Sequence, residues 1–144
     1  MSDKFLCGSC LCRSVRYKVR APIQRFAHCH CSRCRKATGT GHGSYLYVVP
    51  ADFSWVSGEQ HTKRFDLPSA KSFATTFCTM CGSPLPYYTR NGLKVVIPAG
   101  SLDDDPDAVP QVRIFWESRA KWEGSADGLP TCAEFPEWWR LDAV

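Results

Sequence analysis

Residues 78–82 read Cys78-Thr79-Met80-Cys81-Gly82, and two cysteines separated by two residues can both turn toward one metal ion. The following glycine suits the tight knuckle that such a turn needs, because glycine adopts the left-handed backbone conformation without steric cost. Zinc fits this spacing, since it binds soft, deprotonated ligands in a tetrahedron. One such pair is a weak indication of a metal site, so further cysteine clusters are needed to support it.

Two other clusters have similar spacing. They are Cys7-Gly8-Ser9-Cys10-Leu11-Cys12 and Cys29-His30-Cys31-Ser32-Arg33-Cys34. Cys132 stands alone, which brings the count to nine, and an odd number fits poorly with a full disulfide framework. No four-cysteine run of the ferredoxin type occurs, which disfavours an iron–sulfur cluster. The three clusters together predict zinc binding.

The spacing divides seven cysteines into a set of four and a set of three. The set of four is Cys10, Cys12, Cys78 and Cys81, and the set of three is Cys29, Cys31 and Cys34. Four-ligand zinc sites are usually structural, whereas three-ligand sites keep a position for water or substrate.

Other groupings of the cysteines remain open at the level of sequence. Cys29 and Cys31 could instead join the pair in residues 78–82. The set of three could be completed by His28, His30, Cys7 or Cys132, or its thiols could be reduced and metal-free.

Short apolar or alternating runs separated by glycine and proline predict a mainly β architecture. The expected strands cover residues 14–19, 23–27, 44–49, 53–56, 61–65, 71–77, 85–89, 93–97 and 112–115. Residues 32–38 predict one or two helical turns ended by Gly39. Asn91-Gly92 predicts a two-residue hairpin loop, and residues 103–109 predict a loop with at most one helical turn. The length of 144 residues indicates a single domain over 1–144.

Charge and hydropathy limit the partners. The formal charge of +4 falls to about +1 if zinc binds four thiolates at one site and three at another, so nucleic acid is not expected as a partner. No run reaches the roughly 18 apolar residues of a membrane span, and the N-terminus lacks a signal-peptide core, so we expect a cytoplasmic protein that does not enter a membrane. The sequence leaves homo-oligomerisation open.

Motifs across residues 8–130 resemble the family of glutathione-dependent formaldehyde-activating enzymes, which includes centromere protein V. The matching blocks are Gly8-Ser9-Cys10-Leu11-Cys12 followed by Val15-Arg16-Tyr17, residues 29–36 with Gly39, residues 77–85, residues 100–104, residues 118–122 and residues 127–130. The order of these blocks is also that of the family.

The resemblance implies a β-tent fold, in which short antiparallel sheets are held together by a four-cysteine zinc. By resemblance, Cys10, Cys12, Cys78 and Cys81 hold this structural zinc. Cys29, Cys31 and Cys34 would hold a second, catalytic zinc.

The sequence departs from the family motifs at a few positions. Arg13 stands where the family commonly has glycine, Arg113 stands where histidine is frequent, and Cys7 is an additional thiol. None of these changes removes a predicted metal ligand, but they leave the substrate open.

The implied reaction is a carbon–sulfur lyase reaction of the S-(hydroxymethyl)glutathione synthase type, in which a thiol such as glutathione adds to formaldehyde or a related small electrophile. Arg33, Arg35 and Lys36 are candidates for binding the substrate carboxylates, with a solvated cationic face as the alternative. His30 is a candidate acid/base or substrate-binding group. The alternative function is a non-catalytic β-tent binding module stabilised by zinc.

Overall fold

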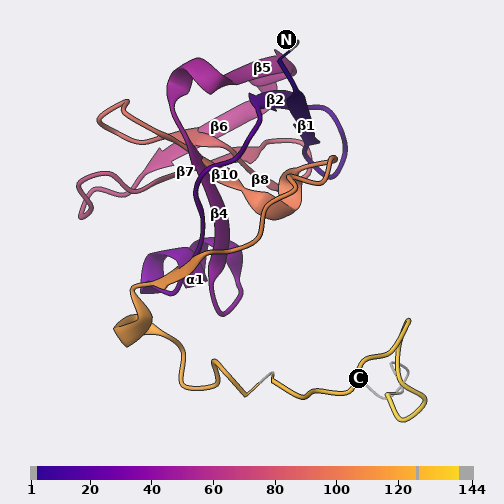
Figure 1. Ribbon diagram of the computed structural model, residues 1–144. Coiled ribbons are helices and arrows are strands. Elements are labelled where there is room, and N and C mark those ends of the chain that lie inside the picture. Colours follow the sequence, from indigo (N-terminus) through magenta and orange to yellow (C-terminus); the bar gives the residue numbers. More distant parts are fainter. Residues whose placement is uncertain (1–2, 126, 140–144) are drawn as a thin grey trace.

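The computed structural model describes residues 3–125 and 127–139, which are mainly β with one α-helix (Figure 1). The first sheet has the order β1-β2-β5 and contains β1 (Phe5–Ser9), β2 (Arg16–Arg20) and β5 (Phe53–Ser57). The central sheet has the order β11-β3-β4-β10-β9 and contains β3 (Phe26–Cys29), β4 (Gly43–Val48), β9 (Tyr87–Tyr88), β10 (Val95–Pro98) and β11 (Val112–Ile114). The third sheet has the order β6-β7-β8 and contains β6 (Thr62–Asp66), β7 (Ala74–Cys78) and β8 (Pro84–Leu85). The expected mainly β fold of short sheets is confirmed.

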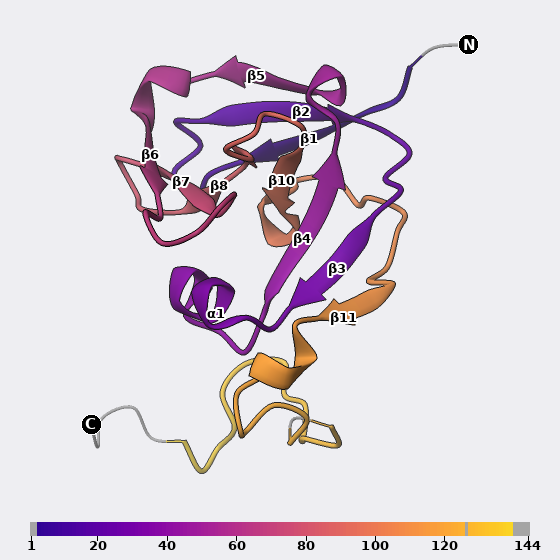
Figure 2. The same ribbon diagram turned by 90° about the vertical axis from the view of Figure 1, so that its left-hand side faces the viewer.

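Strand pairing in the described residues is antiparallel except at one edge of the central sheet. There β11 runs parallel to β3, with Arg113 opposite His28 and Ile114 opposite Cys29. A parallel neighbour needs a long crossover, and here the chain between β3 and β11 passes through the other sheets before it returns. Figure 2 shows β11 beside β3, at the end of the molecule where α1 lies.

The helix α1 (Ser32–Thr38) has the predicted bounds, and its two ends explain them. At the N-terminus, the backbone N–H of Cys34 donates to Cys31 Sγ over 3.3 Å, so Cys31 is the N-cap. At the C-terminus, Gly39 has a φ of 70° and its N–H donates to the Arg35 carbonyl. Short 3₁₀ turns occur at Pro50–Asp52, Glu59–His61, Ala99–Ser101 and Trp116–Ser118.

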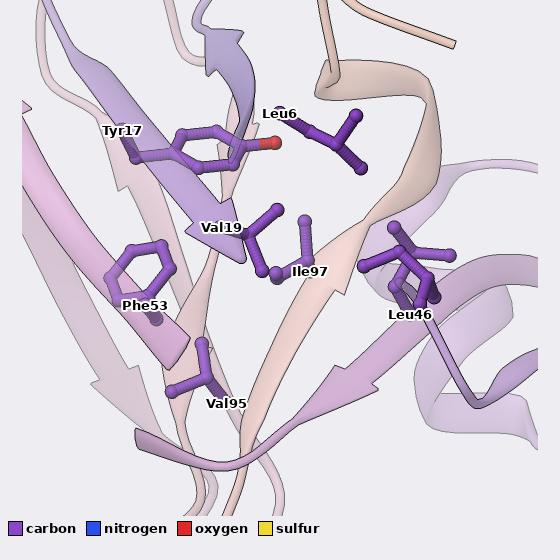
Figure 3. Packing of buried hydrophobic residues seen from close by; sticks show 8 residues of the cluster. Leu6, Tyr17, Val19, Leu46, Phe53, Val95 and Ile97 are labelled. Carbon is purple, nitrogen blue, oxygen red and sulfur yellow. The ribbon is translucent and has the colours of Figure 1, made fainter. Parts of the chain in front are cut away.

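The main hydrophobic core lies between the first sheet and the central sheet. Its buried side chains point toward one another (Figure 3) and are Leu6, Tyr17, Val19, Ile23, Leu46, Phe53, Val95 and Ile97. On β4 the side chains alternate, so Leu46 enters this core while Tyr45 and Tyr47 point to the opposite face of the sheet. This alternation gives the central sheet a second, more polar face.

Pro86 separates two strands where the sequence predicts one strand over residues 85–89. β8 pairs with β7 in the third sheet, whereas β9 pairs with β10 in the central sheet. Proline lacks a backbone N–H to continue a ladder, so the chain changes sheets at this residue.

The hairpin around Asn91-Gly92 forms, but its loop is longer than the predicted two residues. The last paired strand residues are Tyr88 and Val95, and the turn is closed by Thr89 N–H donating to the Lys94 carbonyl over 2.9 Å. The Thr89 hydroxyl also hydrogen-bonds to the Asn91 side chain, and Gly92 has a φ of 71°. In a two-residue loop, residues 90 and 93 would continue the backbone hydrogen bonds of the strands. Here side-chain hydrogen bonds take their place.

Residues 99–109 contain the 3₁₀ turn at Ala99–Ser101 and an isolated β-bridge from Leu102 to Gly8, and the predicted loop over 103–109 is confirmed. No helix among the described residues is both long enough and apolar enough to span a membrane.

Candidate metal centres

Two backbone knuckles bring four thiols together between the first and third sheets. Cys10 and Cys12 lie in the turn between β1 and β2, while Cys78 ends β7 and Cys81 lies in the turn before β8. The ligand atoms of these four residues all lie within 4.8 Å of one another. The second knuckle is closed by Gly82, which has a φ of 76° and donates its N–H to the Cys78 carbonyl over 2.8 Å, as the sequence predicts.

The spacing of these sulfurs fits a tetrahedral metal ion. Cys10 Sγ and Cys12 Sγ are 3.6 Å apart, and Cys12 Sγ and Cys78 Sγ are 3.9 Å apart. A tetrahedron with zinc–sulfur bonds of about 2.3 Å has edges of about 3.8 Å, whereas a disulfide requires about 2.05 Å. All nine cysteines have free thiols. The distances therefore favour a shared ion over disulfide formation.

Burial and a neighbouring hydrogen-bond donor shift the pKa values of Cys10 and Cys81 in opposite directions. Burial raises the pKa of Cys10 to about 11, while hydrogen bonding from the Ser83 hydroxyl, at 3.2 Å, lowers the pKa of Cys81 to about 6. Backbone N–H groups of Val15 and Met80 donate to Cys10 Sγ and Cys78 Sγ over 3.3 Å and 3.4 Å. Donors aimed at sulfur orient metal-bound thiolates, so the surroundings of this set suit a cation.

A second set of three buried thiols lies where β3 meets α1. Cys29 ends β3, Cys31 caps α1 and Cys34 lies in its first turn. Their sulfurs lie within 4.8 Å of one another. A hydrogen bond from the Cys34 thiol lowers the pKa of Cys29 to about 6, and the same bond together with burial raises the pKa of Cys34. Three thiolates at this spacing repel one another, so all three ionise together only around a cation.

No fourth ligand from the described residues joins the set of three. The group whose ligand atoms lie within 4.8 Å of one another contains these three cysteines and, among the described residues, no histidine, carboxylate or further cysteine. In particular, His28, His30, Cys7 and Cys132 lie outside it, and Cys29 and Cys31 do not meet the pair Cys78 and Cys81.

A cavity of about 470 Å³ opens beside the set of three. It is lined by the three thiols, by Arg33, by the phenols of Tyr45, Tyr47 and Tyr87, and by the loop that carries Lys71. Arg33 lies over the ring of Phe73, with its guanidinium carbon 5.7 Å from the ring centre. Arg90 holds this loop in place by donating hydrogen bonds to the carbonyls of Leu67 and Ala70. The thiols therefore face a cavity whose lining combines apolar side chains with three tyrosines and two cationic residues.

The three phenols remain protonated near neutral pH. Burial raises the pKa of Tyr45, Tyr47 and Tyr87 above its usual range, and the neighbouring thiols raise it further. A neutral phenol donates a hydrogen bond, so these residues place O–H groups near any oxygen that enters the cavity.

The structure separates the other candidate residues of the sequence. Arg35 does not line the cavity, because its guanidinium donates to the Ser118 carbonyl over 3.3 Å. Lys36 lines a neighbouring surface hollow with Phe65 and Phe73. His30 is fully buried on the opposite side of the β3–α1 junction, against Trp116.

Lys71 and the three tyrosines escape sequence reasoning. Tyr45 and Tyr47 lie in a run that is typical of an apolar strand. The sequence indicates only that they share a face of that strand, because they are two positions apart. Lys71 reaches the cavity through a loop whose path depends on Arg90, 19 positions further along the chain.

Comparisons with known proteins agree with these features. Residues 5–118 match the sequence profile of a family described as glutathione-dependent formaldehyde-activating enzyme. A Halomonas elongata protein with the provisional name of glutathione-dependent formaldehyde-activating enzyme is 31% identical over 121 residues, which cover 80% of this chain and 77% of that protein. A crystal structure of a Rhodobacter sphaeroides protein superposes with a TM-score of 0.60 at 19% identity, covering 75% of this chain and 98% of that one. The last comparison supports the fold alone.

Proposed function

The chain belongs to the glutathione-dependent formaldehyde-activating enzyme family, and from this premise we propose that it adds a small thiol such as glutathione to formaldehyde or a related small electrophile. The observation that carries the proposal is the set of Cys29, Cys31 and Cys34 at the wall of a cavity that also holds cations and phenols. The reaction is that of a carbon–sulfur lyase running toward addition.

The proposed reaction needs no oxidant or leaving group. The sulfur electron pair of the thiolate forms a bond to the carbonyl carbon, and the carbonyl π pair moves onto oxygen. That oxygen takes up one proton, which balances the proton lost by the thiol. The product is a hydroxymethyl thioether, as in S-(hydroxymethyl)glutathione.

The three-thiol donor set suits zinc, which we propose as the catalytic metal here. Zinc held by three thiolates supplies a fourth coordination position for a substrate thiol and lowers the pKa of that thiol. Cys29, Cys31 and Cys34 are its proposed ligands, and the cavity gives a substrate direct access to them.

The cavity walls suit a thiol that carries carboxylates. Arg33 and Lys71 offer charge-assisted hydrogen bonds to the carboxylates of a glutathione-like substrate. Tyr45, Tyr47 and Tyr87 offer O–H donors to the oxygen that gains charge when the carbon–sulfur bond forms. These residues hold the thiol and stabilise the developing negative charge.

We propose that the set of four holds a structural zinc. Its ligands come from two knuckles that belong to different sheets, and their sulfur spacing matches a tetrahedral ion. A cytoplasmic location suits both sites, because reducing conditions keep the nine cysteines as thiols.

A cobalt-substituted sample tests the thiol step. Cobalt in a cysteine site absorbs light in bands that change when a ligand enters its coordination sphere. We expect added glutathione to shift these bands and S-methylglutathione, which has the same carboxylates but no free thiol, to leave them unchanged. Identical spectra with and without glutathione would contradict the proposal and favour a binding module with two structural sites.

A further inference from the structure

A third group of metal-ligand side chains lies apart from the two cysteine sets. His30, His42 and Glu123 place one ligand atom each within 4.8 Å of one another. His30 Nδ1 is 3.9 Å from one carboxylate oxygen of Glu123, and His42 Nδ1 is 3.7 Å from the other. Each carboxylate oxygen of Glu123 therefore faces one of the two imidazole rings.

Strand alternation keeps this group away from the thiols. Cys29 and Cys31 face the cavity. His28 and His30 alternate with them along the chain and face the other side of the same segment. The His28 ring stacks on the His42 ring with 4.0 Å between centres, and the His30 ring lies 5.0 Å from that of His42. One short segment thus supplies ligands to two separate sites.

The polar atoms of this group lack partners. The His30 side chain is 0% exposed, and among the residues that the structure describes neither of its ring nitrogens has a hydrogen-bond partner. The same holds for Nδ1 of His42. Buried polar atoms are nearly always satisfied by a hydrogen bond, a water or an ion, so two rings with unpaired nitrogens beside a carboxylate require an occupant.

The spacing of the group fits an ion better than direct hydrogen bonds. Hydrogen bonds between imidazole and carboxylate span about 2.7–3.2 Å, and both observed distances exceed this range. Ligands at about 2.05 Å from a tetrahedral ion lie about 3.4 Å apart, and the ligand atoms of this group, all within 4.8 Å of one another, would move closer together around such an ion. His42 and Glu123 are 28% and 15% exposed, which leaves a path for an ion from solvent.

Gly41 makes room for the carboxylate. A Cβ atom at this position would collide with the Glu123 carboxylate and with the ring of Trp122. Glycine at position 41 therefore lets the Glu123 carboxylate and the Trp122 ring lie directly against the backbone before β4. Thr40 also holds the His42 backbone by donating its hydroxyl to the His42 carbonyl.

The geometry points to a third metal site, in which His30, His42 and Glu123 bind one first-row divalent transition-metal ion through two imidazole nitrogens and a carboxylate. Two histidines and one carboxylate suit zinc, cobalt, nickel or ferrous iron rather than calcium or magnesium, which prefer oxygen alone. The described residues leave at least one coordination position of this ion to water or another small ligand.

The total number of zinc and cobalt ions bound per chain tests this site, because it does not depend on which ion the site binds. Zinc-loaded protein is equilibrated with cobalt, separated from free metal by gel filtration, and analysed for zinc and cobalt together. We expect the total to fall by one equivalent per chain in His42→Asn and in Glu123→Gln. His61→Asn, which removes the histidine of the Glu59–His61 turn, is the matched control and should keep the full total.

The cobalt spectrum distinguishes this site from exchange into the cysteine sites. Cobalt bound by nitrogen and oxygen lacks the thiolate charge-transfer absorption that cobalt gains on sulfur. Equal metal totals in the parent protein and both variants, an equal loss in His61→Asn, or charge-transfer absorption from the additional cobalt would each overturn the site. A melting curve of each variant confirms that the compared proteins are folded.

Discussion

Arg13 carries a backbone conformation that glycine would adopt more readily. Its φ is 63°, and its N–H donates to the Cys10 carbonyl to close the first knuckle. A residue with a Cβ is destabilised by roughly 1–2 kcal/mol in the left-handed region, so glycine fits this position with less strain. The larger entropy of unfolded glycine offsets part of this gain.

Arg13→Gly should therefore raise the free energy of unfolding by about 0.5–1 kcal/mol. Denaturant titration measures the change. Arg25→Gly is the control, because Arg25 is also exposed but does not have a positive φ, and it should lower stability. A loss of stability in Arg13→Gly as large as that of the control would contradict the conformational explanation.

Cys31 has two roles that one substitution can separate. Its sulfur caps α1, and we propose that it also binds the catalytic metal. Serine is a preferred N-cap but a poor zinc ligand, so Cys31→Ser should keep the fold while kcat/KM falls at least about 100-fold. Turnover assays and circular dichroism test both halves of this expectation, and retained turnover or global unfolding would each refute it.

Lys71 provides a test of substrate binding at the cavity wall. Lys71→Gln should raise KM for glutathione by about 2- to 5-fold and leave kcat nearly unchanged, because an exposed charge contributes modestly to binding. Lys63→Gln on β6 is the matched control and should leave KM as it is. If both variants changed KM equally, a general loss of positive charge would explain the result.

The grouping of the cysteines is easier to predict from sequence than the cavity beside them. Paired cysteines with one or two residues between them are readable because local backbone geometry brings their sulfurs together, and the four-plus-three grouping matches the distances in the structure. Lys71 and Glu123 approach their sites through tertiary packing, to which no local pattern corresponds. His30 shows where prediction from local sequence ends. Its neighbours in the sequence are cysteines, but strand alternation directs its ring away from them.

At the scale of elements, capping residues and alternating side chains predict the bounds of helices and strands well, whereas the pairing of strands is harder to predict. The bounds of α1 follow from Cys31 and Gly39. The sequence does not indicate β1, because its cysteine-rich segment is typical of a metal-binding loop. In the structure β1 pairs with β2, and Gly8 lies against the ring of Tyr17, where a side chain would collide. The change of sheet at Pro86 and the parallel return of β11 likewise depend on partners distant in sequence.

The strand β4 separates the main core from the cavity: one face packs in the core and the other lines the cavity. Leu46 is 0% exposed in the core, whereas Val49, just beyond the strand, is 53% exposed. Leu46→Ala should lower the free energy of unfolding by about 2–5 kcal/mol through lost burial and a residual void. Val49→Ala should change it by less than about 0.5 kcal/mol, and similar losses in both variants would argue against a core at Leu46.

For the whole molecule, the four-cysteine set joins sheets that are separate in the hydrogen-bond pattern. The first and third sheets meet through Cys10, Cys12, Cys78 and Cys81, supported by the small cluster of Val15 and Leu85. Binding of a structural metal is coupled to folding. The proposed zinc would therefore stabilise the mutual arrangement of these sheets.

Removing metal with a chelator should lower the melting temperature by more than about 10 °C. Cys78→Ser should have the same effect, while the exposed thiol of Cys132 makes Cys132→Ser the control with unchanged melting. Melting curves by circular dichroism make the comparison. A chelated protein that melts like the untreated one would refute a structural role for the metal.

The distance along the chain between the two knuckles also sets an order of events during biosynthesis. Cys12 and Cys78 are 66 positions apart, which takes a ribosome about 3–13 s to translate. The set of Cys29, Cys31 and Cys34 is complete within six residues and is available to a metal ion as soon as they emerge. During this interval the other thiols already synthesised beside Cys10 and Cys12 are Cys7 and the three of the second cluster. The proposed catalytic set is thus synthesised completely before the proposed structural set, so during this interval an ion could also bind across the first two clusters.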